Sequence, residues 1–311
     1  MKKFIGVIIF LFLSFGNTLL GQNVYEFLRL DMSPRAAALA GSFVANNDDV
    51  DVMFYNPAGI GSLNGRPISF SFVKHLLDIN SASLSYSRNI GNIGRFAAGI
   101  QYINYGNFTE ADEFGNRTGE FKAGDFAFTL GYSNVLDKNF YYGVNVKLIY
   151  SSIASVSSSA YAFDVGLQYK IPSSKWSFGF SVSNMGAQFS SYGSVKESLP
   201  LDMRLGFAKT LAHLPLTIYF SFNKLSDNYS TFGDRFNQFT VGGEIAISKS
   251  VLFRFGYDNE KRSELKVGST AGFGGFNLGL GINISSYRVD YSYSSLGSIG
   301  ALHRFGVSTN L

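Results

Sequence analysis

The chain has 311 residues, no cysteine, 46% hydrophobic and only 15% charged residues, and a formal net charge of +4. The absence of cysteine excludes a disulfide framework and a lipid anchor on cysteine. The small, evenly spread charge gives no reason to expect a nucleic-acid partner. The 31 Phe, 18 Tyr and 34 Gly are typical of a protein that faces lipid and carries aromatic rings at headgroup level.

Residues 1–21 have the pattern of a secretory signal peptide. Two lysines precede an apolar run over residues 4–15, and cleavage is expected after Gly21. The run is too short to favour the alternative of an uncleaved anchor helix, which needs about 20 apolar residues. The rest of the chain has no apolar run of helix length, so only a closed barrel would satisfy its backbone in a membrane.

Residues 22–66 have no strand pattern and are predicted to form a plug segment against or inside the rest of the chain. Ser33 as N-cap and Pro34 at the first helical position predict a helix over 34–40, ended by Gly41. The segment is too small to hold a core of its own.

From Pro67 to the C-terminus, apolar residues alternate with small or polar residues. A period of two predicts β-strands with one apolar and one polar face. We predict a fourteen-stranded antiparallel transmembrane β-barrel over residues 67–311. The predicted strands are 67–75, 80–90, 94–105, 121–134, 138–152, 157–171, 175–184, 200–210, 214–224, 236–247, 251–258, 275–284, 287–295 and 302–310.

The connections between these strands sort by length. All those after even-numbered strands are short, and the long ones, 106–120, 185–199, 225–235 and 259–274, all follow odd-numbered strands. Short periplasmic turns and long external loops produce this pattern in outer-membrane barrels of Gram-negative bacteria. An even strand count then places both termini in the periplasm, with outer-membrane lipid around the wall.

The polar face carries charges of both signs, which we interpret as a structural network that helps to close the lumen, with a substrate path as the alternative. A buried charge without a partner would cost several kcal/mol. The residues predicted for this network are Asp164, Arg204, Glu244, Arg254, Arg288, Asp290 and Arg304.

Several short motifs at the two ends of the mature chain resemble the PorV/PorQ family, within the wider FadL-like group of outer-membrane barrels. The N-terminal motifs are Tyr25-Glu26-Phe27-Leu28, Ser33-x-Arg35-Ala36-Ala37-Ala38-Leu39-Ala40-Gly41, Asp48-Asp49 and Asn56-Pro57-Ala58-Gly59. The C-terminal motifs are Asp290-Tyr291-Ser292-Tyr293, Leu296-Gly297 and His303-Arg304-Phe305-Gly306. The resemblance implies fourteen strands and an N-terminal segment inside the lumen.

The resemblance also implies a role in the type IX secretion system. PorV-like members shuttle secreted substrates, and PorQ-like members sit in a cell-surface attachment complex with a sortase-like and a lipopolysaccharide-recognising partner. The opening Val24-Tyr25-Glu26-Phe27-Leu28 and the modest length resemble the PorQ-like branch more. The Asn56-Pro57-Ala58-Gly59 motif is shared across FadL-like proteins.

No enzyme, cofactor or metal motif is found. His75, His213 and His303 lie at predicted strand ends or turns and do not converge as metal ligands. A membrane hydrolase would need a Ser–His pair, for which only His75 with Ser81 and Asp78 is available. The acidic group Asp48, Asp49 and Asp51 allows calcium binding, but a polar plug loop is the favoured interpretation.

Three functions therefore stay open. The first is a non-enzymatic binding and scaffold barrel that acts through aromatic residues of the long loops. The residues expected for partner binding are Phe108, Phe114, Phe189, Tyr192, Tyr229 and Phe232; they are equally expected to close the barrel top. The second is passive uptake of hydrophobic molecules, with an apolar pocket around Leu39, Val52, Phe54 and Ile60. The third is a structural porin.

Overall fold

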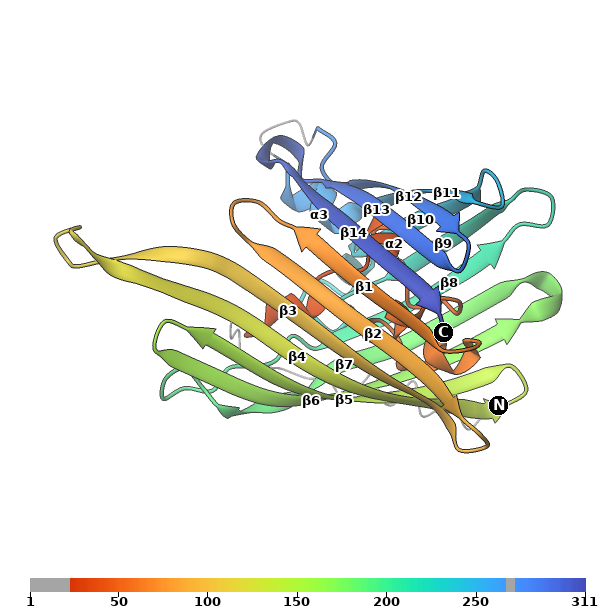
Figure 1. Cartoon of the computed structure of the whole chain (residues 1–311), viewed down its shortest axis with the longest axis horizontal. Helices are drawn as coiled ribbons and strands as arrows, with labels where there is room; N and C mark the ends of the chain where they lie inside the picture. The colour runs from red at the N-terminus through yellow and green to blue at the C-terminus, as the bar shows by residue number, and fades with distance from the viewer. Residues whose placement is uncertain (1–22, 267–271) are drawn as a thin grey trace.

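The computed structural model describes residues 23–266 and 272–311, so the predicted signal peptide lies outside the described residues. The described residues form one closed antiparallel barrel of fourteen strands, in which β1 also pairs with β14 (Figure 1). This confirms the predicted fold class. The strands are β1 (Pro67–Lys74), β2 (Asn80–Ile90), β3 (Gly94–Ala111), β4 (Arg117–Asp137), β5 (Phe140–Ile153), β6 (Val156–Ile171), β7 (Trp176–Ser190), β8 (Asp202–Thr210), β9 (Leu216–Phe222), β10 (Phe239–Ala246), β11 (Val251–Asp258), β12 (Phe276–Ile284), β13 (Tyr287–Ser295) and β14 (Ala301–Asn310).

The wall is much taller on one side than on the other. Strands β3 to β7 have 14 to 21 residues, whereas β8 to β14 have 7 to 10. The predicted loop 106–120 is wrong, because β3 and β4 continue as a paired hairpin and leave only 112–116 as the turn. In the same way, β7 extends to Ser190 and shortens the predicted loop 185–199.

The two faces of the wall follow the predicted alternation. Outward residues such as Phe70, Leu130 and Leu148 are exposed, and inward residues such as Ser85 and Asn145 are buried. Aromatic rings follow one another around the outside of several strands, with neighbouring centroids about 5 to 6.5 Å apart. Each such pair contributes about 0.5–1.5 kcal/mol beyond its buried area.

Residues 23–66, which we call the plug, lie inside the barrel (Figure 1). They form η1 (Glu26–Arg29), α2 (Pro34–Ala38), η2 (Val50–Phe54) and η3 (Pro57–Ser62). The predicted helix over 34–40 ends at Ala38, and the Ser33 hydroxyl bonds to Asp51 instead of capping the helix. No helix among the described residues is long and apolar enough to cross a bilayer.

The plug packs tightly against the wall and within itself. Leu39, Val52 and Ile60 are fully buried in one core cluster with Phe54 packed against it, so the apolar pocket expected around these residues is instead a filled core. Glycines on the wall let the plug backbone approach closely. At Gly179, for example, any Cβ would lie 2.1 Å from a carbonyl oxygen of the plug and would clash with it.

Candidate functional site

The plug is held to the wall by the guanidinium of Arg35, which lies on α2 and is almost fully buried. Its Nε and Nη2 donate to Glu244 on β10 at 2.9 and 2.8 Å. Its Nη1 and Nη2 donate to Asp48 at 2.9 and 3.2 Å, and Nη1 also reaches Asp49 at 3.4 Å. Bidentate contacts of this kind are among the strongest hydrogen bonds in proteins.

The same carboxylates continue into the wall. Arg254 Nε donates to Glu244 at 2.5 Å, and its Nη1 donates to Asp290 at 2.6 Å. Arg288 Nε donates to Asp290 at 2.6 Å, and its Nη2 donates to Asp49 at 2.5 Å. Together with Arg35 these residues form a closed ring of alternating charge, which we call the ion ring. Each charge has two opposite partners, which offsets the cost of burial.

The ring contains four of the seven residues predicted for the lumen network. Asp164 instead pairs with Lys147 at 2.9 Å, and Arg204 pairs with Asp202 at 2.6 Å. Arg304 donates to the carbonyl of Asp31 at 2.6 Å and to the hydroxyl of Ser294 at 2.7 Å. The sequence interpretation of this network omitted Arg35, although a single charge inside an alanine-rich helix is a signal for a buried ionic contact.

Asp51 differs from the other plug carboxylates because no cation within the described part of the chain pairs with it. It accepts hydrogen bonds from Ser69 and Ser85 at 3.0 and 2.5 Å. Burial, and then the neighbouring charge of Asp49, raise the pKa of Asp51 to about 6. The carboxylates weighed for calcium therefore face arginines or serines, and the described residues contain no group of three or more side chains able to hold a metal.

One part of the inner wall is apolar. Val73, Ile103 and Ile149, from β1, β3 and β5, are buried on the inward face, together with Ala127, Ala160 and Ala162. We call these six residues the inner apolar patch. The plug covers the patch with Tyr25, Phe27, Leu28 and Met32. The lumen is thus not uniformly polar, and the N-terminal part of the plug occupies its apolar side.

Near this patch the pairing between β7 and β8 stops early. It ends at Ser183 and Asp202, whereas β7 remains paired with β6 as far as Ser190. Asn184 adopts a left-handed conformation with φ 64° at this point. Segment 191–201 fills the interval, so we call this place the β7–β8 seam.

A second apolar cluster lies at the seam. Val182 and Met203 face outward by strand alternation, yet they are only 8% and 4% exposed. They pack with Leu225 and with the partly buried Phe180, Met185, Leu201 and Phe222. Segment 191–201 contributes Leu199 to the inner apolar patch cluster and Leu201 to this outer cluster. The two clusters therefore meet along one connecting segment.

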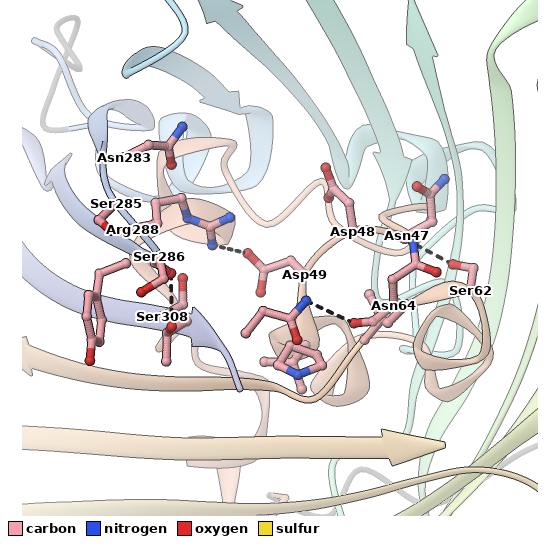
Figure 2. Close-up of a pocket in the computed structure, with 16 residues that line it drawn as sticks. Asn47, Asp48, Asp49, Ser62, Asn64, Asn283, Ser285, Ser286, Arg288 and Ser308 are labelled. Carbon is pink, nitrogen blue, oxygen red and sulfur yellow. Dashed lines mark hydrogen bonds and ion pairs between the residues drawn. The ribbon is translucent and has the colours of Figure 1, made fainter. Parts of the chain in front are cut away.

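The cavity shown in Figure 2 has a mixed lining of polar and apolar groups. It measures about 330 Å³ and lies between the plug, the β12–β13 turn and the end of β14. Asn47, Asn64 and Asn283 line it with several serines, and the Asp49–Arg288 ion pair stands at its wall (Figure 2). Val50, Leu63, Pro67 and Tyr287 add apolar surface to the same cavity.

The six aromatic residues expected for partner binding fall into two groups. Phe108, Phe114, Phe189 and Phe232 are exposed. Tyr192 bonds to the hydroxyl of Ser151 and Tyr229 donates to the carbonyl of Lys224 at 3.0 Å. The two tyrosines are thus held by the chain itself and act as closing contacts rather than as free anchors.

The histidines give no catalytic arrangement. His75 Nε2 lies 2.9 Å from the hydroxyl of Ser81, but Ser81 is buried and no carboxylate in the described chain bonds to the other ring nitrogen. His303 bonds to the hydroxyl of Tyr291 on the wall. A nucleophile that a substrate cannot reach does not support a hydrolase.

Comparison with known proteins supports the fold. No protein-family model matches the sequence, and no curated protein does. The toluene transporter TbuX of Ralstonia pickettii is 12% identical with a TM-score of 0.59, over 89% of this chain and 96% of TbuX. The Pseudomonas putida toluene transporter TodX is 13% identical with a TM-score of 0.59, over 95% and 100%. A Pseudomonas aeruginosa FadL homologue is 12% identical with a TM-score of 0.58, over 93% and 99%.

At this level of identity the similarity shows a shared fold, that of FadL-like outer-membrane barrels. The fold that the resemblance to FadL-like barrels implies is therefore confirmed. None of the three similar proteins is a PorV/PorQ protein, so the narrower resemblance and its link to type IX secretion gain no support.

Proposed function

We propose that this barrel passes small hydrophobic molecules across the outer membrane, along the inner apolar patch and out through the β7–β8 seam. The observation that carries the proposal is the apolar patch on the inner wall, which the chain's own Phe27 and Leu28 occupy. A site that binds these side chains has the chemistry to bind an apolar ligand in their place. The shared fold with two toluene transporters supports the same function.

The packed lumen defines the route. The ion ring and the filled core around Leu39 leave no reason to expect passage through the centre of the plug. Residues 23–32 lie outside the ion ring. Apolar contacts hold them, together with one parallel bridge between Asn23 and Ser198 and polar contacts such as the ion pair of Arg29 with Asp227 at 2.6 Å. Movement of this part would expose the patch and, through segment 191–201, the seam. The occluding element of the proposal is therefore residues 23–32.

A reversible disulfide tests the route. Bridge partners lie within the Cα separation that a disulfide requires, and the chain has no other cysteine. Asn23→Cys with Ser198→Cys is produced in cells without hydrophobic channels of their own, and entry of N-phenyl-1-naphthylamine is followed by fluorescence. We expect slow entry for the oxidised pair, and fast entry after reduction or in either single variant. Equal entry in the oxidised and reduced states would refute the route, and entry no faster than in cells without the barrel would refute transport itself.

A second candidate is the binding and scaffold role in type IX secretion, with sortase-like and lipopolysaccharide-recognising partners. The filled lumen favours it, because a scaffold needs no open path. Affinity purification of the tagged protein from outer membranes, followed by mass spectrometry, tests it. Absence of secretion components in cells that contain them would exclude this role.

A further inference from the structure

The hairpin formed by the ends of β3 and β4 projects far beyond the rest of the barrel (Figure 1). Strand β2 pairs with β3 only up to Asn104, and β5 pairs with β4 only up to Ala123. Beyond these points the two strands continue to pair with each other, and we call residues 108–121 the arm. No other strand among the described residues pairs with either edge of the arm, so its backbone groups are free to accept a partner.

The tip of the arm is a closed turn that holds an aromatic ring outward. The Asp112 carboxylate accepts hydrogen bonds from the backbone N–H groups of Phe114 and Asn116 at 3.0 and 2.8 Å, and from the Asn116 amide at 2.9 Å. Phe114 is 81% exposed. An aromatic residue on a preordered turn loses little conformational entropy on binding, so it is well suited as an anchor.

A second aromatic contact lies at the base of the arm. Phe108 and Phe121 face each other across the hairpin and stack, with ring centroids 5.1 Å apart. Phe108 is still exposed. The arm therefore offers one apolar group at its tip and a second at its base.

Charge identifies the kind of surface that fits this arm. Four carboxylates, from Glu110, Asp112, Glu113 and Glu120, lie along the arm from its tip to its base together with one cation, Arg117. None of these five side chains forms an ion pair with another side chain of the described residues. The complement of this surface is an apolar pocket rimmed by lysine or arginine.

We propose that the arm docks onto a partner protein that presents such a pocket for Phe114. A membrane surface is disfavoured because its anionic headgroups repel the acidic tip, and a second copy of this chain would bring two acidic tips together. The proposal goes beyond transport and does not depend on it.

Photo-crosslinking tests the docking in outer membranes of the cells that produce the protein. The full chain carries p-benzoylphenylalanine in place of Phe114, and the control carries it in place of Phe232, which is also exposed but lies on another loop. We expect one dominant protein adduct from the tip and not from the control. The crosslinked partner peptide should lie beside lysine or arginine residues.

Charge reversal separates docking from chance proximity. Glu113→Lys with Glu120→Lys should lower the adduct at least tenfold, and exchange of the partner's basic rim residues for Glu should restore it. Heat-modifiable migration in gels confirms that the variant barrel is folded. An adduct only with lipopolysaccharide or with a second copy of this chain, no adduct, or an adduct unchanged by charge reversal would overturn the proposal.

Discussion

Replacement of Arg35 by methionine should release the plug while leaving the barrel intact. Methionine retains much of the apolar stem but removes five bonds to Glu244, Asp48 and Asp49. Breaking a buried ion pair by removing one partner typically costs about 3–5 kcal/mol, because the remaining charge stays buried; here this applies to Glu244 and Asp49, whereas Asp48 is exposed to solvent. The wall contributes Glu244 from β10, so this loss falls on the plug–wall contact rather than on strand pairing.

The lack of native cysteine makes the release measurable. Ser42 is buried in the plug and donates to the hydroxyl of Thr240 at 2.7 Å, so Ser42→Cys reports opening through its rate of maleimide labelling. A loss of 3–5 kcal/mol predicts labelling roughly 200- to 5,000-fold faster, since each 1.36 kcal/mol is a factor of ten. Arg117→Met, on the exposed arm, is the control and should have no effect. A rate within threefold of the parent, in a barrel that still shifts on heating in gels, would show that the ion ring does not hold the plug.

Three further predictions use the same reporter or the barrel itself. Burial raises the pKa of Asp51 from 3.8 to about 6 in the folded chain, so the contribution of Asp51 to plug docking is complete below pH 3.8 and is lost, by about 3 kcal/mol in total, as the pH rises through 6. The lowered pKa values of Asp48 and Asp49 act in the opposite direction at acid pH, so the comparison is made between pH 4 and 7. Asp51→Asn should abolish this pH dependence of the labelling rate, which is normalised at each pH to the rate of a free thiol. A labelling rate that depends on pH as strongly in the variant as in the parent would contradict this prediction. Gly179→Ala places a Cβ 2.1 Å from the carbonyl oxygen of Val44, and an overpacking cost of about 1–3 kcal/mol predicts labelling roughly 5- to 150-fold faster. In the control Gly193→Ala, the added Cβ has no atom within 4 Å, so the labelling rate should stay unchanged. Asp164→Ala leaves Lys147 buried without its carboxylate and removes the acceptor of the Asn184 backbone N–H. We expect faster hydrogen exchange over residues 182–186 and a lower urea midpoint, and an unaltered exchange rate there would show that Asp164 does not hold the β7–β8 seam.

The strand pattern was readable from the sequence because each wall residue meets one of two unlike surroundings. The period-two alternation at Tyr287–Ser295 reports this directly, and the strand count follows from it. The arm was predicted as a loop because its residues do not meet two unlike surroundings. Its residues are exposed on both faces, so no alternation marks them, although they pair across the hairpin.

The contents of the lumen were less predictable. Inward charges such as Glu244 and Asp290 were identified from strand alternation, but which of them meet depends on the path of the plug, and no local pattern encodes that path. Arg35 bonds to Glu244 on β10, which lies 209 positions further along the sequence. Tyr192 and Tyr229 show the same limit, because each was chosen as a loop aromatic and each bonds back to its own chain.

The plug has a consequence for how the barrel is built. Its helix α2 contacts β11 to β14, and η2 contacts β1 and β2, so the plug touches both sides of the β1–β14 closure. Wall glycines such as Gly179 leave no clearance for a chain that arrives late. The plug therefore bridges the seam at which the first and last strands close the barrel, and its contacts on both sides support that closure.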